Sequence, residues 1–411
     1  MRIALVCHYF APEPGAPQAR LEETARTWVR DGHDVTVLTG FPNHPDGVLA
    51  AADRGRLFRA EERDGIRVLR SWLFATPNRG VLKKTLGHLS FMATAALVGG
   101  ARARRPDVVV VSSPTFFSVF AAAFLARRWG CPWVFEVRDL WPAIFTELGV
   151  LTNRTAIGIL TRLELALYRR ATRVVTVTDG FRENIVGRGI EPGRVVTITN
   201  GVDTRRFAPV ADRAEIRDRL GVADRFVVLY LGAHGVSHAL GRMLDVAARW
   251  RDDPSALFRF VGEGAEKRGL EARAAAEGLT NVEFLPAVQK DEVADLYHAA
   301  DVCLVPLRDV PLFSTFLPSK MFEIMGCGRP VLASVRGEAA EILARSGGAV
   351  VVPPEDVGSI DRALRELRES PERRREMGRA GADFVRRHYD REVLATRYAD
   401  LLSKIVAGGA A

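Results

Sequence analysis

The feature that most constrains the fold is an alternation of apolar strand-like runs and helical segments that spans nearly all of the 411 residues. Residues 3–7 form an apolar run, residues 20–30 have helical spacing before Gly32, and residues 34–38 form the next apolar run. Two parallel strands need a crossover connection, and strands buried on both faces are continuous apolar runs. This opening segment therefore predicts a βαβ unit and a parallel sheet.

The alternation falls into two series, separated by a turn-rich, charged stretch at 200–224 that contains Pro209. Further strand-like runs lie at 108–111, 133–137, 174–177 and 195–198 in the first series, and at 226–231, 258–262, 282–285, 301–306, 330–334 and 349–353 in the second. Each series predicts a doubly wound α/β domain, and the chain is long enough for two ordinary cores. We expect domains at 1–203 and 204–389, followed by an amphipathic helix at 390–405.

The net charge is positive but does not by itself identify a partner. The formal charge is +8 and the pI is near 9.6, which suits nucleic acid, a membrane surface or phosphate-rich ligands. Nearly all the basic residues are arginine in an alanine-rich chain, a bias that genome composition also produces. We therefore predict no nucleic-acid partner.

Neither a targeting segment nor a membrane span is predicted, and we expect a cytoplasmic protein. Residues 1–7 lead directly into a strand rather than forming a signal peptide. Residues 108–126 are uncharged, but the turn at 112–115 divides them into a strand-forming and a helix-forming run. The cysteines have no spacing typical of zinc or redox sites, and we expect buried free thiols. These cysteines are Cys7, Cys131, Cys303 and Cys327.

The loop at 8–20 follows the first predicted strand, and ligands of open α/β sheets bind beyond the carboxyl ends of strands. Gly15 allows close approach of a backbone, and the helix near Arg20 offers free N–H groups. The dinucleotide fingerprint Gly-x-Gly-x-x-Gly is absent. An ordinary surface loop is an equally good interpretation.

The loop at 231–244 follows the first strand of the second series. Gly232 and Gly235 make it flexible enough to wrap an anion against a helix N-terminus. His234 and His238 have a metal-like spacing, but no third ligand lies nearby in the sequence. Hydrogen bonding to phosphate or to backbone is therefore favoured over a metal.

The stretch at 312–334 pairs a cation with a carboxylate on one helical face. Pro318 suits the first position of a helix, which places Lys320 in the first turn, where the helix dipole disfavours a cation. Glu323 lies three residues further on the same face. An anion bound by Lys320 and sugar hydroxyls bound by Glu323 explain this arrangement, and an exposed ion pair explains it equally well.

Arg138 and Asp139 lie at the carboxyl end of another predicted strand, within residues 135–145. Such a charged pair forms either a substrate clamp or a salt bridge. The chain contains no Asp-x-Asp triplet, the usual metal–diphosphate anchor of single-domain transferases.

Several segments together resemble glycosyltransferase family 4, over nearly the whole chain. They are PDVVVVSSP (106–114), LYRRATRVVTVTDGFRENIVGRGI (167–190), TNGVDTRRFAP (199–209), FVGEGAEKRGLEARAAAEGLTNVEFLPAV (260–288), LYHAADVCLVP (296–306), PSKMFEIMGCGRPVLAS (318–334) and GEAAEIL (337–343). Within the family, YFAPEPGAPQAR, LTGFPNHPDG, VRDLWP and LPSKMFE resemble WbuB-type transferases of bacterial surface polysaccharide assembly.

The resemblance implies a GT-B fold, in which two Rossmann-like domains face a cleft and the C-terminal helix, within 390–411, crosses back to the first domain. It implies a nucleotide-sugar donor, UDP-linked, in the second domain and a glycan, lipid-linked or small-molecule acceptor in the first. Transfer would retain the anomeric configuration by front-face attack, with the leaving phosphate taking the acceptor proton. No metal, other cofactor or protein nucleophile is then expected.

The resemblance also assigns roles to individual residues. The expected donor-binding residues are His234, Gly235, His238, Gly262, Lys267, Phe316, Leu317, Lys320 and Glu323. Arg138, Asp139 and Glu323 are the expected catalytic residues, and Gly15 and Arg20 are expected to bind the acceptor. In the family signature Glu-x7-Glu the second position is Glu323, but the first is Thr315. The carboxylate that would contact the transferred sugar is therefore missing, and backbone N–H groups of Phe316 and Leu317 would take over part of that contact. The family's Arg and Lys after the first strand of the second domain are Ala233 and His238 here.

Lipid-linked acceptors of related enzymes raise the question of membrane contact. Residues 81–105 are apolar in the middle and basic at both ends, but too short in their uncharged part to span a bilayer. Interfacial binding to anionic lipid at the inner face of the plasma membrane is one interpretation. A core helix with solvated ends is slightly favoured.

Two other functions remain open. A nucleotide-sugar epimerase of GT-B fold would convert its substrate without an acceptor. A non-catalytic sugar-nucleotide sensor would explain the departures at Thr315 and Ala233.

Overall fold

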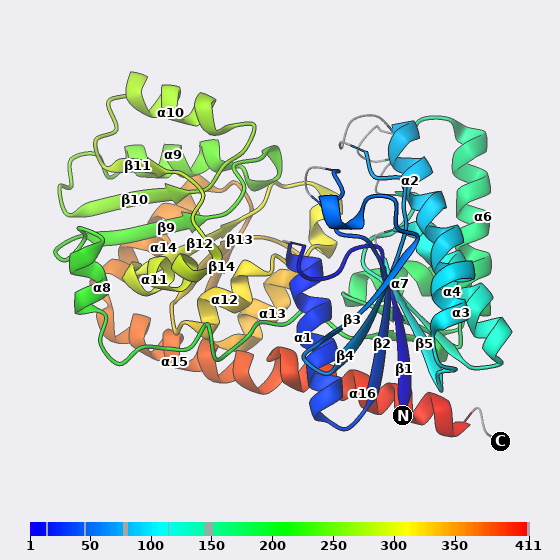
Figure 1. Ribbon diagram of the computed structural model, residues 1–411. Coiled ribbons are helices and arrows are strands. Elements are labelled where there is room, and N and C mark those ends of the chain that lie inside the picture. The colour runs from blue at the N-terminus through cyan, green and yellow to red at the C-terminus, as the bar shows by residue number, and fades with distance from the viewer. Residues whose placement is uncertain are drawn as a thin grey trace. The chain divides into compact units, whose positions relative to one another are not determined.

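The computed structural model describes residues 1–13, 15–44, 47–76, 81–113, 115–143, 146 and 151–408. The chain forms two compact units (Figure 1). Unit 1 comprises Met1–Thr199 and Arg391–Ala411, and unit 2 comprises Asn200–Asp390. The boundaries expected from the sequence, after residues 203 and 389, lie close to these divisions.

Unit 1 contains an eight-stranded sheet in the order β3-β4-β2-β1-β5-β6-β7-β8. Its strands are β1 (Arg2–Val6), β2 (Asp34–Gly40), β3 (Phe58–Arg63), β4 (Ile66–Ser71), β5 (Val108–Ser112), β6 (Trp133–Val137), β7 (Arg173–Thr176) and β8 (Val195–Thr197). All neighbours are parallel except β3 and β4, which form an antiparallel hairpin that the sequence pattern did not predict. The order reverses between β1 and β5, whose carboxyl ends therefore flank a switch point.

Helices cover both faces of the sheet in unit 1. They are α1 (Ala16–Arg30), α2 (Val81–Thr94), a π-helical turn η2 (Ala95–Gly99), α3 (Gly100–Arg102), α4 (Phe116–Trp129), α6 (Arg154–Arg170), α7 (Asp179–Gly187) and α16 (Arg391–Gly408), with 3₁₀ turns η1 (Ala51–Asp53) and η3 (Pro192–Arg194). On one face α16 packs against α1, where the Trp28 indole donates to the Ala395 carbonyl over 2.9 Å. On the other face lie α4 and α6. The C-terminal helix thus belongs to unit 1, as the resemblance implied.

Unit 2 contains a six-stranded parallel sheet in the order β11-β10-β9-β12-β13-β14. Its strands are β9 (Phe226–Leu231), β10 (Ala256–Val261), β11 (Val282–Leu285), β12 (Val302–Pro306), β13 (Val331–Ser334) and β14 (Ala349–Val352). Its helices are α8 (Ala214–Arg219), α9 (Leu240–Ala248), α10 (Lys267–Ala276), α11 (Val293–Ala299), α12 (Lys320–Gly326), α13 (Glu338–Ser346), α14 (Val357–Glu369) and α15 (Pro371–His388), with 3₁₀ turns η4 (Val236–His238), η5 (Lys290–Glu292) and η6 (Pro311–Thr315). The predicted pair of doubly wound α/β domains is confirmed.

Two helix starts differ from the prediction. Helix α1 begins at Ala16 rather than near Arg20, with Pro17 in its first turn, where a missing N–H costs nothing. Helix α12 begins at Lys320 rather than at Pro318, because residues 318–319 form a preceding turn in which the Met321 N–H donates to the Pro318 carbonyl. Lys320 nevertheless lies in the first helical turn.

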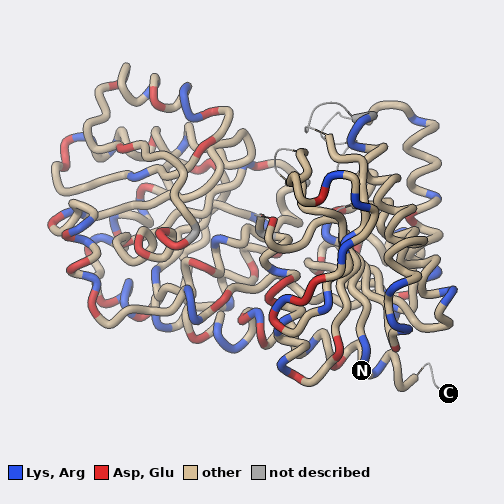
Figure 2. Tube along the Cα trace, in the orientation of Figure 1, with Lys and Arg blue, Asp and Glu red and all other residues tan. Residues whose placement is uncertain are grey.

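Charged residues are spread over both units (Figure 2), but the excess of positive charge belongs to unit 1. Unit 1 contains 30 Lys and Arg against 20 Asp and Glu, whereas unit 2 contains 28 against 30. Among the described helices, none is both long and apolar enough to cross a membrane. All four cysteines are free, and three are buried as expected; Cys131 is only half-buried because it follows the C-terminal end of α4.

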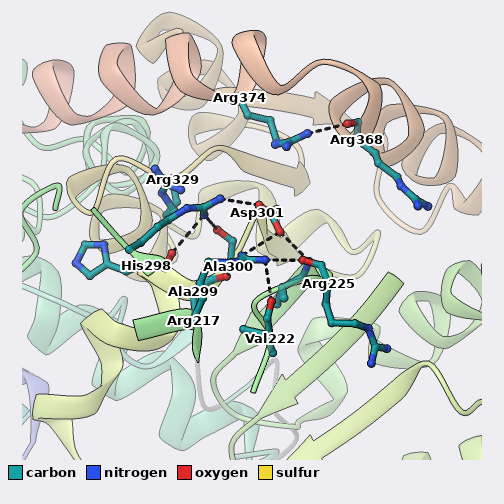
Figure 3. A network of polar contacts seen from close by, with 12 residues as sticks. Arg217, Val222, Arg225, His298, Ala299, Ala300, Asp301, Arg329, Arg368 and Arg374 are labelled. Carbon is teal, nitrogen blue, oxygen red and sulfur yellow. Dashed lines mark hydrogen bonds and ion pairs between the residues drawn. The ribbon is translucent and has the colours of Figure 1, made fainter. Parts of the chain in front are cut away.

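An ion-pair network closes unit 2 at the amino ends of its strands (Figure 3). The Asp301 carboxylate, just before β12, accepts hydrogen bonds from the Val227 N–H (2.9 Å), Arg213 (2.8 Å) and Arg217 (3.2 Å). Arg217, on α8, also donates to the carbonyls of Ala299, Val222, Ala223 and Arg225. The network joins α8 to the amino ends of β9 and β12. It therefore leaves the carboxyl ends of these two strands uncovered by its own side chains.

Candidate functional site

In unit 2 the strand order reverses between β9 and β12, so the loops after these strands flank the switch point. After β9, the chain runs from Gly232 through η4 to Ala239, which has a positive φ of 47°. After β12, it runs through η6 to α12. Most of the predicted donor-binding residues lie on these two segments.

The loops after β9 and β10 touch backbone to backbone. The His234 N–H donates to the Glu263 carbonyl over 2.8 Å, and the Gly232 N–H donates to the Val261 carbonyl over 2.9 Å. Gly262 has a φ of 144°, and a Cβ there would lie 1.9 Å from the Gly232 carbonyl oxygen. Only glycine allows this approach, which shapes the loop at the switch point.

Replacing Gly262 with alanine is expected to lower the thermal midpoint of unfolding and to weaken nucleotide binding. The added methyl group would displace the backbone of Gly232, and alanine at positive φ costs more than about 1 kcal/mol. The matched control is Gly269→Ala on α10, where an added Cβ meets no atom within 4 Å. That change is expected to be neutral or stabilising. Calorimetry that finds both variants as stable as the parent would contradict this account of the loops.

Lys320 places a buried cation beside the loop after β9. Its Nζ lies 4.1 Å from the centroid of the Tyr230 ring and has no hydrogen-bonding partner among the described residues. A Cβ on Gly232 would lie 2.5 Å from this Nζ, so the ammonium group faces the loop backbone. Burial lowers the pKa of Lys320 to about 8, against the opposing charge of Glu323. A bound anion would supply the partner that this cation lacks.

Glu323 lies on α12, one turn after Lys320. Its Oε2 accepts a hydrogen bond from the buried Tyr297 hydroxyl over 3.2 Å. Within the described part of the chain, the Lys320 ammonium group forms no ion pair with this carboxylate. The alternative of an exposed ion pair is therefore wrong, because the Lys320 amine is buried over Tyr230.

The two histidines of the loop after β9 occupy different environments. The His234 ring is fully buried between Tyr230 and Phe284, with centroid distances of 5.8 and 6.0 Å, and neither ring nitrogen has a hydrogen-bonding partner among the described residues. Burial, helped by Lys267, lowers its pKa. His238 is half-buried, its Nδ1 lies 3.4 Å from the Pro306 carbonyl oxygen, and burial together with Lys320 lowers its pKa to about 4. Both rings are therefore neutral at pH 7.

Two of the expected donor-binding groups are already engaged within unit 2. Lys267 Nζ donates to the Gly262 carbonyl (2.9 Å), the Leu285 carbonyl (3.0 Å) and the Glu263 carboxylate (2.8 Å). The Phe316 N–H donates to the Phe313 carbonyl over 3.2 Å, and Leu317 packs against the core. Lys267 cannot bind phosphate, and the Phe316 N–H cannot contact the transferred sugar, without giving up these bonds. Gly235 immediately precedes the η4 turn in the loop after β9.

In unit 1 the structure brings Arg20 and Arg138 together on one carboxylate, that of Glu136 in β6. Arg20 pairs with both Glu136 oxygens, at 2.8 and 3.1 Å, and Arg138 Nη1 lies 3.4 Å from Oε1. Glu136 is 2% exposed; burial would raise its pKa, but Arg20 and then Arg138 outweigh burial and lower it. Burial, with the repulsion of Arg20, lowers the pKa of Arg138 to about 10. Arg20, expected to bind the acceptor, and Arg138, expected to be catalytic, thus share the Glu136 carboxylate as an ion-pair partner.

Asp139 and Gly15 complete the predicted set in unit 1. Burial raises the pKa of Asp139, and Arg138 opposes this shift. Gly15 precedes α1 with a φ of 147°, and a Cβ there would lie 2.3 Å from the Gln18 amide oxygen. Nearby, the Glu13 carboxylate accepts the N–H groups of Phe10, Asn43 and His44, which ties the loops after β1 and β2 together.

Sequence reasoning missed Glu136, Glu13, Tyr230 and Tyr297. A signal was present for Glu136, because a carboxylate inside the apolar run WVFEV requires a buried partner. Tyr230 and Tyr297 carry no such signal, since aromatic residues are ordinary in cores. Among the described residues, no group of three or more His, Cys, Asp or Glu side chains could hold a metal ion. The expected absence of a metal stays a prediction.

Two family models match consecutive parts of the chain. One described as "Glycosyl transferase 4-like domain" matches residues 15–201, and one described as "Glycosyl transferases group 1" matches residues 212–384. The putative colanic acid biosynthesis glycosyl transferase WcaI of Escherichia coli is 26% identical over 378 residues, covering 89% of this chain and 92% of the relative. A GDP-mannose-dependent alpha-mannosyltransferase of Mycobacterium tuberculosis is 25% identical over 368 residues, covering 89% and 86%.

Solved structures of similar fold cover the whole chain. Sucrose-phosphate synthase from Thermosynechococcus elongatus superposes with a TM-score of 0.74 at 21% identity, covering 99% of both chains. Anabaena HepE in complex with UDP-glucose superposes with a TM-score of 0.67 at 18% identity, covering 98% of this chain and 100% of the other. These likenesses concern the fold.

Proposed function

Because the chain belongs to glycosyltransferase family 4 and has the GT-B fold, we propose that it transfers a sugar from a UDP-linked donor to an acceptor with retention of configuration. The observation that carries this proposal is the buried Lys320 ammonium group, which lies beside the glycine loop at the switch point of unit 2 and has no hydrogen-bonding partner among the described residues. Such a cation suits the diphosphate of a nucleotide sugar. Glu323, on the same face of α12, suits a pair of ribose hydroxyls.

The identity of the nucleotide base is the finer part of this proposal. The HepE complex contains UDP-glucose, which supports UDP, whereas the mycobacterial relative is named for GDP-mannose. Isothermal titration with UDP and with GDP separates the two. Tighter binding of GDP would overturn the choice of UDP and leave the transferase proposal standing.

In the proposed reaction, the acceptor hydroxyl attacks the anomeric carbon from the face that the diphosphate leaves. The bond between the anomeric carbon and the diphosphate oxygen breaks, the bond to the acceptor oxygen forms, and the acceptor proton passes to the leaving diphosphate. Lys320 stabilises the charge that develops on this group. We propose that no metal takes part; activity that EDTA abolishes and Mg²⁺ restores would contradict this.

We place the acceptor in unit 1, where Gly15, Arg20, Arg138 and Asp139 lie at or near the carboxyl ends of β1 and β6. The shared anchor at Glu136 supports a common role for Arg20 and Arg138. The name of WcaI, a putative colanic acid biosynthesis glycosyl transferase, supports a biosynthetic role. We propose a glycan or lipid-linked acceptor.

The proposal is tested by incubating the protein with a panel of nucleotide sugars, with and without lipid-diphosphate and glycan acceptors, and analysing the products by mass spectrometry. We expect sugar transfer only when an acceptor is present. Conversion of a nucleotide sugar without acceptor would favour an epimerase, and binding without any turnover would favour a sensor. Either of these outcomes overturns the proposal.

Replacing Glu323 with glutamine is expected to lower kcat/KM for the donor about 10- to 100-fold, because hydrogen bonds to a charged group contribute about 1.5–3 kcal/mol. The matched control is Glu341→Gln, an exposed carboxylate on α13. Steady-state kinetics should show the control unchanged. Transfer and donor affinity that persist in Glu323→Gln would mean that the ribose site is assigned wrongly.

A further inference from the structure

Glu355, in the turn between β14 and α14, has a left-handed backbone conformation. Its φ is 60°, which glycine adopts without cost and other residues rarely adopt. Two hydrogen bonds hold this turn: the Glu355 N–H donates to the Ser334 hydroxyl over 3.0 Å, and that hydroxyl donates to the Pro353 carbonyl over 3.2 Å. Neither bond uses the Glu355 side chain, so glycine would make the same turn with less strain. The turn alone therefore does not explain a glutamate at this position.

The Glu355 carboxylate holds the loop that follows β12. Its Oε2 accepts the Asp309 N–H over 2.9 Å, and its Oε1 lies 3.9 Å from Nε of Arg242 on α9. Asp309 in turn accepts two hydrogen bonds, of 3.0 and 3.2 Å, from Arg336 in the loop after β13. We call Glu355, Asp309 and Arg336 the loop clamp. It joins the loops that follow β12, β13 and β14 at the carboxyl edge of the sheet in unit 2.

The loop clamp flanks η6 on two sides. Along the chain, Asp309 stands two residues before η6 begins. In space, the residue after Arg336 touches η6, since a Cβ on Gly337 would lie 2.1 Å from the Ser314 carbonyl oxygen. Asp309, Arg336 and Ser314 also line one pocket of about 400 Å³. A displacement of the loop clamp would therefore move η6.

The contacts of the loop clamp lie at the surface of unit 2. The side chains of Asp309 and Arg336 are 49% and 60% exposed, and that of Glu355 is 29% exposed. Exposed ion pairs contribute little to the free energy of folding. Strained backbone conformations are concentrated at functional sites, where the geometry that they fix is part of the mechanism. A strained residue with weakly stabilising contacts therefore points to a role in geometry rather than in stability.

We propose that Glu355 is a positioning residue for sugar transfer. Through Asp309 and Arg336 it holds η6, so that Thr315 and the backbone of residues 316–317 lie where the transferred sugar requires them. Glu355 itself would touch neither substrate. A displacement of about 1 Å in such a segment can lower a rate about a hundredfold. This inference rests on the proposed function, because it concerns the same reaction.

The first test is Glu355→Gly, which removes the carboxylate and relieves the strained backbone. At saturating donor and acceptor, kcat should fall at least about tenfold, because η6 loses its support. The dissociation constant of UDP should stay unchanged, since the site assigned to UDP lies on α12 and the loop after β9. The thermal midpoint of unfolding should not fall, because glycine adopts a positive φ freely. A residue that merely stabilised the fold would change the midpoint and leave kcat as it was.

Two variants serve as controls. Glu355→Gln keeps a side-chain oxygen that can accept the Asp309 N–H, so it should retain most of the parent kcat. Asp64→Gly relieves the same kind of strain, since Asp64 has a φ of 51°, and it also removes a carboxylate that accepts a hydrogen bond from Arg26 over 2.8 Å. Asp64 lies in the β3–β4 hairpin of unit 1, so this variant should keep the parent kcat.

Hydrogen exchange of residues 307–317, followed by mass spectrometry, tests the inference without turnover. We expect faster exchange in Glu355→Gly, and exchange at the parent rate in Glu355→Gln and Asp64→Gly. Exchange in Glu355→Gly that equals the parent's would overturn the inference, and so would transfer by this variant at the parent's rate. A joint fall of kcat, UDP affinity and thermal midpoint would also overturn it, because Glu355 would then only stabilise the fold. A parent that transfers no sugar contradicts the proposed function, and the inference with it.

Discussion

Replacing Lys320 with methionine is expected to lower kcat/KM for the nucleotide sugar at least about a hundredfold, the usual effect of removing one charge-stabilising donor. The Nζ is buried over Tyr230, faces the Gly232 backbone and has no other hydrogen-bonding partner among the described residues. It is therefore available to the diphosphate. Methionine keeps the length of the side chain and its apolar contacts, so the loss should be specific to the charge.

The matched control for this prediction is Lys267→Met. The Lys267 ammonium group already bonds the Gly262 and Leu285 carbonyls, so its removal should lower the thermal midpoint of unfolding and change KM only slightly. Lys320→Met should instead raise the midpoint, because a folded pKa of about 8 means that the fold disfavours the charged amine. If Lys267→Met loses the greater share of donor affinity, the diphosphate site is assigned to the wrong lysine.

The pH dependence of donor binding follows from the same pKa. The pKa of Lys320 in the free protein is about 8, so the cation is lost as the pH rises above that value. The dissociation constant of UDP should then rise by up to about tenfold per pH unit above pH 8. The neighbouring His234 and His238 have lowered pKa values and stay neutral throughout this range, so they do not compensate. A dissociation constant that is flat between pH 7 and pH 9.5 would be incompatible with this assignment.

Replacing Asp301 with alanine is expected to lower the free energy of unfolding by about 3–5 kcal/mol, the range for breaking a buried ion pair from one side. The change leaves Arg213 and Arg217 without their carboxylate and the Val227 N–H without an acceptor. Arg217 cannot turn to solvent without abandoning the carbonyls around Val222 and Ala299 (Figure 3). Urea unfolding at pH 7 measures the effect.

The matched control is Asp291→Ala, which removes an exposed pair with Arg206. The Asp291 side chain is 96% exposed, and such pairs contribute about 0–1 kcal/mol. Equal losses of unfolding free energy in Asp301→Ala and Asp291→Ala would contradict the role given to the buried network.

The acid dependence of the Asp301 contribution has a definite sign. Burial alone would raise the pKa of Asp301, but the Val227 N–H and the two arginines outweigh burial and hold it below its ordinary value. A lowered folded pKa gives stability that is present above the unfolded pKa, about 3.9, and is lost as the pH falls below it. The difference in the free energy of unfolding between the parent and Asp301→Ala should therefore be constant from pH 5 to pH 8 and become smaller in stronger acid.

Most of the fold could be predicted because parallel strands buried on both faces are continuous apolar runs. The core strands β1, β5, β9 and β12 all have this pattern. The hairpin β3–β4 was missed because β3, FRAEER, is half-exposed and mostly polar. Its pairing with β4 depends on a neighbour rather than on its own hydrophobicity.

The candidate site also has features that the sequence predicts and features that depend on tertiary contacts. The position of Lys320 in a first helical turn and its shared face with Glu323 follow from spacing alone. The engagement of Lys267 with three oxygen atoms does not, because two of its acceptors are carbonyls on different strand ends. The burial of His234 between Tyr230 and Phe284 also depends on contacts 50 residues apart in the chain.

By itself, the sequence determined the two doubly wound domains, the loops at the switch point and the positions of Lys320 and Glu323, because hydrophobic periodicity and helical spacing are local properties. The tertiary structure alone decided which charges are available. It joined Arg20 and Arg138 through Glu136, engaged Lys267 and left Lys320 without a partner among the described residues. Whether a charge is paired depends on which segments fold together, and this information is not local to the chain.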